Sequence, residues 1–418
     1  MKENKLWFQE VVEESEHIGR ISNVLDNKAY LNGTHKVLSR KDFEFKEETY
    51  TTSKIVLNTL KTVIDFHSSL IVGKPASVVG GNPEIINIFN QLYRESGYNK
   101  LNYDIVKTLY SYGDVFEYVY QDGDKIKSKL ISSADAHPVY DIQGNYVSFV
   151  EYWTDILTSS EYYVVYKPEA VERWDNEGTG VLVKKAEYKN STGLPIHYSN
   201  NENYSYDYYG KSILEDLKPI LDEIELLLSK MNDSIYTLSL NPLFTVSGQK
   251  VDSQIDSGLV GAILNLEDGA EAQYQSANLD SASIKLLLDN LLNQLYTIAG
   301  VPSSIIGQSN VSNVSEVSLE LLFRLAINKA RATEHILHEG LQKRHEYIMK
   351  LLGLKLKKGE YVDVVFNYDL PVDNGETMDN MKTQWDMGAI STETIISNSP
   401  YTNDVALEMD RLKGDSSI

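Results

Sequence analysis

The sequence contains no cysteine and little proline. Its 418 residues include 0 Cys and 10 Pro. The lack of cysteine excludes disulfide frameworks, cysteine-based zinc sites and thiol nucleophiles. Hydrophobic residues still make up 42% of the chain and aromatic residues 10%, which excludes a globally disordered protein. The length allows two or three domains with real hydrophobic cores.

Positive charge is also scarce. The chain has 39 Lys and Arg against 60 Asp and Glu, a formal net charge of −21. Proteins that grip nucleic acid over their surface need Lys and Arg to displace counterions from the phosphates. The composition therefore argues against a protein of that class.

Long hydrophobic runs are absent as well. The most apolar early stretch, Ile55–Val72, is interrupted by Lys61, Asp65 and His67, which makes it too polar to span a bilayer. Residues 1–17 lack the apolar segment of a signal peptide. We expect neither a membrane span nor a secretion signal.

The first half of the chain predicts helices followed by strands. Helical spacing of apolar residues predicts a helix over 52–71, ended by Gly73-Lys74-Pro75, and further helices over Pro83–Ser96 and Leu101–Tyr112. Five runs rich in β-branched and aromatic residues, separated by Gly-containing turns, then predict an antiparallel meander. These runs are Val115–Gln121, Lys125–Ile131, Tyr146–Thr154, Tyr162–Lys167 and Val181–Tyr188.

The second half predicts long helices around a short strand-rich insert. Ser212 and Glu215 have the spacing of a capping box at the start of a helix that extends past Ile235, and Pro219 predicts a kink in it. Strand-like sequence over 241–275 follows. The remaining expected elements are a helix over Ser281–Ala299, a polar uncharged loop over Ser303–Ser315, a helix over Glu316–Leu352, a strand over Tyr361–Tyr368 and a helical tail over Glu376–Leu412.

Patterns for catalysis or metal binding are weak. Gly210-Lys211-Ser212 ends like a phosphate-binding loop, but Ser205 stands where that motif needs a glycine. His335, His338 and His345 share a predicted helix without a His-Glu-x-x-His pattern, so a solvated polar face is favoured over a metal site. We expect no catalytic, cofactor-binding or metal-binding residue, and no enzyme.

Charge is unevenly distributed along the chain. Residues 251–323 contain nine acidic residues and a single basic one, Lys285. Residues 324–358 contain nine basic residues and three acidic ones. Ordinary surface solvation would explain such a boundary, but here it divides a block of helix, strands, helix, polar loop and long helix.

The order of these parts resembles that of bacteriophage portal proteins, specifically those of tailed phages that infect Gram-positive hosts. The closest local match is Leu295–Pro302 (LYTIAGVP), followed by a Ser/Asn-rich loop and Asn313–Leu319 (NVSEVSL). Other matching segments are Tyr30–Gly33, Ile64–Asp65, Gly73–Pro75, Tyr112–Glu117, Gly210–Ser212 and Glu376–Leu412.

This resemblance implies an α+β portal fold: a mixed α/β wing, a two-helix stem, a small α/β clip, a long kinked helix and a helical C-terminal crown, in a ring oligomer. The implied regions are an N-terminal wing part (1–211), a first stem helix (212–236), a clip (237–279), a second stem helix (280–299), a tunnel loop (300–315), the long helix and strand of the wing (316–372) and a crown (373–418).

The resemblance also implies a role in the virion. Twelve copies would form a ring at one capsid vertex, assembled in the host cytoplasm, and double-stranded DNA would pass through it without sequence specificity during packaging and ejection. The implied partners are further copies of the chain, the terminase large subunit, a head–tail adaptor, and the major capsid and scaffolding proteins. No cofactor and no membrane are implied, because the ATPase is the terminase.

The resemblance assigns roles to three groups of residues. An acidic or uncharged channel lowers the adhesion to DNA that Lys and Arg would create. The tunnel-loop candidates are Ser303, Ser304, Ile305, Ile306, Gly307, Gln308, Ser309, Asn310 and Asn313, a loop without lysine. The acidic channel candidates are Asp280, Asp289 and Glu316, and the clip candidates facing terminase or adaptor are Asp252, Asp256, Glu267 and Asp268.

Two alternatives remain open at this point. One is another ring-shaped head–tail connector, although such adaptors are generally shorter and lack the long helix. The other is an acidic polysaccharide hydrolase, suggested by 28 tyrosines and many carboxylates. A large ring with a central hole distinguishes the portal from a hydrolase, which forms a small particle.

Overall fold

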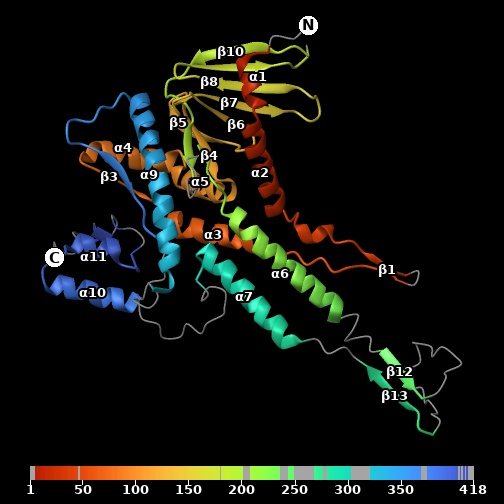
Figure 1. The fold of residues 1–418 in the computed structure, drawn as a ribbon. Coiled ribbons are helices and arrows are strands. Elements are labelled where there is room, and N and C mark those ends of the chain that lie inside the picture. The colour runs from red at the N-terminus through yellow and green to blue at the C-terminus, as the bar shows by residue number, and fades with distance from the viewer. Residues whose placement is uncertain are drawn as a thin grey trace.

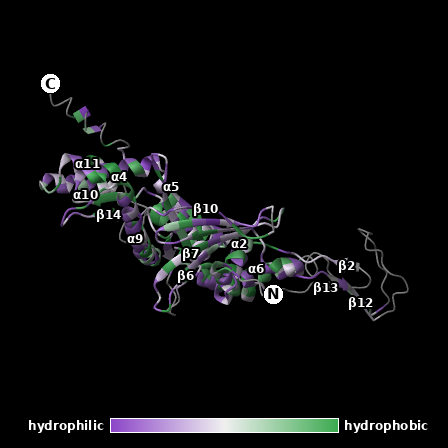
Figure 2. Cartoon of the chain, turned by 90° about the horizontal axis from the view of Figure 1, so that it is seen from above, coloured by the Kyte–Doolittle hydropathy of each residue, from purple (hydrophilic) through white to green (hydrophobic). Residues whose placement is uncertain are grey.

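The protein has an elongated shape. The computed structural model describes residues 5–45, 48–178, 180–200, 208–235, 243–248, 268–275, 280–302, 321–368, 374–402, 405, 408–409 and 411–412. Seen from above, the β12–β13 hairpin lies at one end and the C-terminal helices α10 and α11 at the other (Figure 2).

The helices form most of the scaffold (Figure 1). They are α1 (Trp7–Val12), α2 (Ser15–Leu31), η1 (Lys36–Ser39), α3 (Thr59–Val72), α4 (Pro83–Glu95), α5 (Tyr98–Tyr112), α6 (Leu214–Ser234), α7 (Ser281–Ala299), α9 (Arg324–Leu352), α10 (Asn374–Asp386) and α11 (Thr392–Asn398). The largest core lies among α3, α5, α6 and α9, where side chains such as Ile64, Leu109, Leu221 and Leu341 are buried.

The strands form two main sheets and three two-stranded ones. They are β1 (Phe43–Phe45), β2 (Glu48–Tyr50), β3 (Ser77–Gly80), β4 (Asp114–Asp122), β5 (Lys125–Ile131), β6 (Ala136–Tyr140), β7 (Tyr146–Thr154), β8 (Glu161–Tyr166), β9 (Ala170–Asp175), β10 (Val183–Lys189), β11 (Ile196–Ser199), β12 (Leu243–Ser247), β13 (Glu271–Gln275) and β14 (Val362–Val365). The strand orders are β10-β9-β8-β7-β6, β11-β4-β5, β1-β2, β12-β13 and β14-β3.

The predicted meander is confirmed only in part. All five predicted strands exist, but β4 and β5 pair with β11, while β7, β8 and β10 belong to the five-stranded sheet. The two sheets share a core that contains Phe116, Phe149, Tyr166 and Val171. Sequence patterns missed β6, β9 and β11, because β6 contains a proline, β9 carries charged residues and β11 is only four residues long.

Several predicted helix boundaries are wrong. The helix expected over 52–71 begins at Thr59, and α1 and α2 were not predicted. The predicted single helical tail is interrupted: α10 and α11 are separated by a turn in which Gly388 has a φ of +66°. The helix over Ser281–Ala299 is confirmed as α7. The strand expected over 361–368 is confirmed as the shorter β14, which pairs with β3.

A buried ion pair joins four elements of the main core. The Arg344 guanidinium of α9 donates from Nε to both carboxylate oxygens of Glu117 on β4 (2.8 and 3.0 Å) and from Nη2 to one of them (2.8 Å). Asn102 of α5 accepts from Nη1 at 2.6 Å, and the Tyr198 hydroxyl of β11 donates to Glu117 at 2.7 Å. The guanidinium also lies 4.8 Å from the centre of the Tyr98 ring.

The surroundings keep this pair charged. Burial is the largest single effect and would lower the pKa of Arg344, but the charge and hydrogen bonds of Glu117 together with Tyr198 and Tyr93 outweigh it and hold the pKa well above its ordinary value. Close approach of α9 to β11 also depends on Gly340, since a Cβ atom there would lie 2.0 Å from the Tyr198 ring. Charge and shape together fix α9 on the sheet.

We expect the variant Glu117→Leu to lose about 3–5 kcal/mol of unfolding free energy, because it leaves the Arg344 charge buried without its carboxylate. The double variant Glu117→Leu/Arg344→Met leaves no unpaired charge and should lose less. Urea unfolding of the purified proteins measures both losses, and equal losses would contradict this account of the pair.

Candidate functional site

The helices α6 and α7 form a pair that projects from the main core towards the β12–β13 hairpin (Figure 1). Leu217, Leu221 and Ile224 of α6 are buried, as are Leu295 and Ala299 of α7. These apolar side chains pack at the end of the pair nearest the core, whereas Leu287 and Ile298 of α7 are exposed. This pair leads directly into the segment predicted as the tunnel loop.

The start of α6 differs from the predicted capping box. The Ser212 hydroxyl donates to the carbonyl groups of Tyr110 (2.9 Å) and Ser111 (2.8 Å) at the end of α5, and it accepts from the Leu214 amide at 3.1 Å. At Gly210, a Cβ atom would lie 2.1 Å from the carbonyl oxygen of Gly113. The Gly-Lys-Ser sequence is thus a close packing corner between α5 and α6.

An extended segment before α3 is bonded along α6. Alternate backbone amides of this segment donate to α6 side chains that are four residues apart, since two residues of extended chain and four of helix both advance about 6 Å. The bonds run from Ser53 to Asp233 (2.8 Å), from Ile55 to Ser229 (3.0 Å) and from Leu57 to Glu225 (2.7 Å). This ladder explains why residues 52–58 are not helical.

The ladder is reinforced by a buried acid–imidazole contact. Glu225 is fully buried and lies 2.7 Å from Nδ1 of His35. The other ring nitrogen of His35 lies 3.0 Å from the carbonyl oxygen of Tyr30, and the Tyr30 hydroxyl donates to Asp222 of α6 at 3.0 Å. The end of α2 is thereby fastened to the middle of α6.

The end of α7 is held by a single histidine of α3. Nε2 of His67 lies 2.7 Å from the carbonyl oxygen of Ala299, the last residue of α7, and Gly300 follows with a φ of +70°. Burial lowers the pKa of His67 to about 4, so the ring is neutral at pH 7 and donates this hydrogen bond. The predicted tunnel loop (300–315) begins at the next residue, and its first candidate residue, Ser303, follows four residues after Ala299.

One face of α7 carries uncharged polar side chains. Asn290, Asn293, Gln294 and Thr297 are all exposed, and their spacing places them on one side of the helix. The stripe was not predicted from the sequence: the helical phase of the amides indicates that they share a side of α7, but which side is exposed depends on how α7 packs. Nearer the free end of α7, Leu286 and Leu287 are 64% and 49% exposed.

The structure describes three of the predicted acidic candidates. Asp280 is the N-cap of α7 and accepts from the Ser283 amide at 3.1 Å. Asp289 and Asp268 are exposed. Nine residues of helix are about two and a half turns, so Asp280 and Asp289 lie on opposite sides of α7. The candidates outside the described residues are Ser303, Ser304, Ile305, Ile306, Gly307, Gln308, Ser309, Asn310, Asn313, Glu316, Asp252, Asp256 and Glu267.

The three histidines of α9 have separate surroundings. His338 lies 2.6 Å from Asp363, His345 lies 2.8 Å from the Tyr93 hydroxyl, and His335 is exposed. The described part of the chain contains no group of three or more side chains that could hold a metal ion. Nor does any of its helices have the length and apolar character needed to cross a membrane.

Comparison with known families decides between the alternatives. The model of the phage portal proteins of the SPP1 Gp6-like type matches residues 12–417. The chain belongs to this family. The family is structural and its members are parts of the virion, so the resemblance found in the sequence is confirmed and the polysaccharide hydrolase alternative is wrong.

Solved structures support the same fold. The chain is similar to a protein in the neck of a native gene transfer agent particle computed with C12 symmetry, with a TM-score of 0.50 and 12% identity over 80% of this chain and 87% of that one. It is similar to a protein in the neck of the empty particle, computed with C6 symmetry, with the same TM-score and identity over 80% and 88%. No curated protein sequence matches this chain.

We expect folding stability to fall between pH 6.5 and pH 4.5, in part through His67. The ordinary histidine pKa is 6.5, and that of His67 is about 4 in the folded protein. The unfolded chain therefore takes up a proton in this range and the folded one does not, which costs about 2–3 kcal/mol.

The variant His67→Gln keeps an amide donor for Ala299 but cannot titrate, so its loss of stability should be smaller by that amount. Urea unfolding at the two pH values measures the difference. The other buried histidines contribute equally to both proteins, and an unchanged pH dependence would show that His67 is not a source of it.

Proposed function

We propose that this chain forms a ring at one vertex of a phage capsid, through which double-stranded DNA is packaged by terminase and later ejected, and to which head–tail adaptors dock. The observation that carries the proposal is the portal-family match over residues 12–417. The C12 symmetry reported for the neck of one structural neighbour supports a ring of twelve. Scaffolding and major capsid proteins are the further partners.

The regions of the portal can be assigned to elements on this basis. Residues 1–211 and 316–372 are the wing, α6 and α7 within 212–236 and 280–299 are the stem, 237–279 with β12–β13 is the clip, and 373–418 with α10 and α11 is the crown. The separation of β12–β13 from α10 and α11 supports a clip and a crown at opposite ends (Figure 2).

The stem has the two different flanks that a closed ring needs. Head-to-tail rings join unlike surfaces of neighbouring copies. The free end of α7 exposes Leu286 and Leu287 one turn beyond the amide stripe, on the same side of the helix, so the proposed contact with a neighbouring copy lies nearer the clip than the stripe does. The helix α6 exposes the carboxylates Glu215, Asp216 and Glu223. Exposed leucines on a helix that packs on one side only favour burial against a neighbouring copy.

The channel is proposed to be weakly adhesive. Residues 281–299 contain only two charged side chains, Lys285 and Asp289. An uncharged polar stripe such as the one on α7 forms short-lived hydrogen bonds with DNA phosphates and lacks the cations that would hold them. Of the acidic candidates, Asp289 lies four residues before Asn293 and would border this stripe, Asp280 lies on the opposite side of α7, and Glu316 is proposed to face the channel. The clip carboxylates at 252, 256, 267 and 268 are proposed to face terminase or adaptor.

We expect the wild-type protein to form rings with a central hole in negative-stain images, with a mass of several copies of the 47.3 kDa chain in light scattering. The variant Leu286→Asp/Leu287→Asp places charges in the proposed stem interface and should shift the protein to smaller species.

The matched control is Ile156→Asp/Leu157→Asp, which changes two apolar residues that are each 94% exposed in the β7–β8 hairpin. Rings should persist in this control. If the wild-type protein stays monomeric at the highest concentration tested, the proposed function is wrong. If the stem variant still forms rings, only the proposed stem interface is wrong.

The proposed tunnel loop is tested by deletion of residues 303–313. Rings should remain, because the stem helices and their anchors are unchanged, but DNA packaging or retention should fail for lack of the constriction. Packaging of nuclease-protected DNA in complemented phage lysates measures this outcome. Normal packaging by the deletion variant would exclude the loop as the constriction.

A further inference from the structure

The shared core of the two main sheets is open at one end. Phe116 and Phe149 are completely buried within it, whereas Tyr188, on the edge strand β10, is 40% exposed. Between these ends lies a cavity of about 400 Å³, a size that suits a small ligand or a few side chains of a peptide. Leu351, near the end of α9, closes one wall of it.

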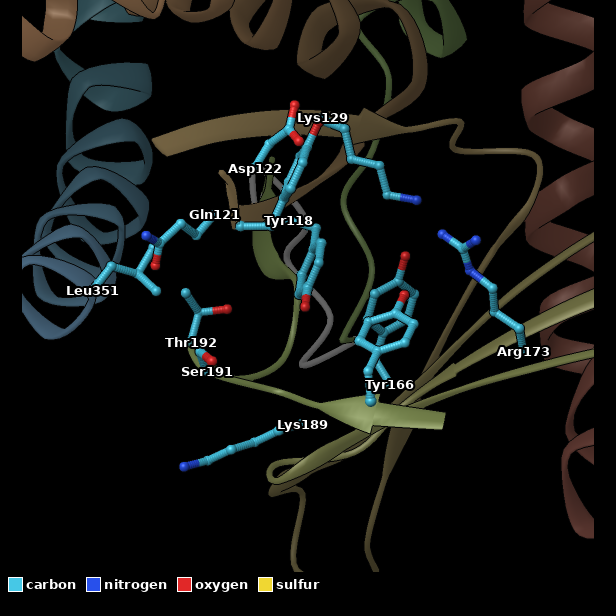
Figure 3. A pocket seen from close by; sticks show the side chains of 12 residues that line it. Tyr118, Gln121, Asp122, Lys129, Tyr166, Arg173, Lys189, Ser191, Thr192 and Leu351 are labelled. Carbon is cyan, nitrogen blue, oxygen red and sulfur yellow. The ribbon is translucent and has the colours of Figure 1, made fainter. Parts of the chain in front are cut away.

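The lining of this cavity is aromatic. Tyr118 and Tyr120, on one face of β4, have nearly parallel rings with centres 6.1 Å apart. Tyr166 of β8 meets Tyr118 edge to face at 4.7 Å, and Tyr188 of β10 completes the set. Figure 3 shows Tyr118 and Tyr166 turned towards a common space. Such a surface takes flat or apolar groups by stacking and burial.

The charges of the lining leave two cations without a carboxylate. Lys129 is paired with Glu151 (2.8 Å), and Asp122 with Lys127 (2.6 Å). In the part of the chain that the structure describes, Arg173 and Lys189 have no carboxylate within ion-pair distance. The Arg173 guanidinium lies 5.6 Å from the centre of the Tyr188 ring and points into the cavity in Figure 3.

The cavity thus has a local excess of positive charge, although the whole chain has a net charge of −21. A cation of Arg173 beside stacked tyrosines favours an anionic group joined to a flat or apolar one. Lys189 lies at the edge of the lining opposite Arg173, with its amino group turned away from Tyr118 and Tyr166 (Figure 3). The two cations therefore suit one or two carboxylates close to an aromatic or aliphatic group.

An edge strand continues from the cavity. β10 ends the five-stranded sheet, so one of its edges has no strand partner among the residues that the structure describes, and all seven of its residues are exposed. An unpaired edge presents N–H and C=O groups to an extended peptide. Because Tyr188 and Lys189 belong both to β10 and to the cavity lining, a peptide paired with β10 would bring its side chains to the cavity.

We propose that the cavity between the two sheets, together with the edge of β10, binds an extended acidic peptide segment of another protein, with an aromatic or aliphatic side chain in the cavity and carboxylates at Arg173 and Lys189. None of the cavity's lining residues belongs to the stem helices α6 and α7. Binding of a DNA strand is disfavoured, because Arg173 and Lys189 are too few cations to hold a continuous run of phosphates.

The test uses the full-length protein and a fluorescein-labelled short peptide in which Asp and Glu alternate with Phe and Trp. Fluorescence anisotropy should show binding that is about tenfold weaker or more in Arg173→Gln/Lys189→Gln, since a charge-assisted contact is worth at least one factor of ten. Both side chains are exposed and unpaired, so the variant should melt at the wild-type temperature.

The matched control is Lys61→Gln/Arg94→Gln, which removes one exposed Lys and one exposed Arg from α3 and α4 and should leave affinity within twofold. Amide hydrogen exchange of residues 183–189 should slow when the peptide binds. Equal loss in the control, equal binding of a peptide with Asn and Gln in place of Asp and Glu, or preference of the site for an oligothymidylate would each overturn the proposal. Ring images of the wild type test the proposed function separately.

Discussion

The position of the long helix α9 depends on one buried charge pair, Arg344 with Glu117. Two charges removed from water are costly unless every remaining donor and acceptor is satisfied, and here Asn102 and Tyr198 supply the additional bonds. Since these partners come from α5, β4 and β11, the pair admits one placement of α9 relative to the sheets. The helix α9, which follows the proposed tunnel loop, is therefore held firmly against the core. The helix α7, which precedes the loop, is held there by the contact between His67 and the carbonyl oxygen of Ala299.

Local sequence patterns predicted the elements that are stabilised mainly by contacts between residues close together in the sequence. The bounds of α7 follow from its apolar spacing and from Gly300, and those of β5 from its alternation and turns. Residues 52–58 have helical spacing yet are extended, because three of their amides bond to side chains of α6 that lie far away in the sequence. Ser212 has a capping pattern, but its hydroxyl bonds to the end of α5 instead. Long-range hydrogen bonds outweigh local preference in both places.

The difference between local and long-range contacts also separates the site residues that the sequence could indicate from those that it could not. Charge counts drew attention to Asp280 and Asp289, but only the helical geometry of α7 shows that they lie on opposite sides. The amide stripe depends on knowing which side of α7 is covered. The tyrosine-lined cavity is assembled from β4, β8, β10 and α9, so no spacing within the chain could have indicated it.

The relation of this acidic chain to DNA depends on where its charges lie. Net charge sets long-range repulsion, but within a Debye length of about 10 Å the local side chains decide adhesion. A strongly acidic channel wall would raise the energy of DNA along its whole path, whereas a basic wall would hold the phosphates. The surface of α7, as the proposed channel wall, carries only Lys285 and Asp289 within residues 281–299 and would do neither. A channel through which DNA moves needs a wall with few charged side chains. A wall in which basic and acidic side chains balance also has a net charge near zero, but its basic side chains would still hold the phosphates.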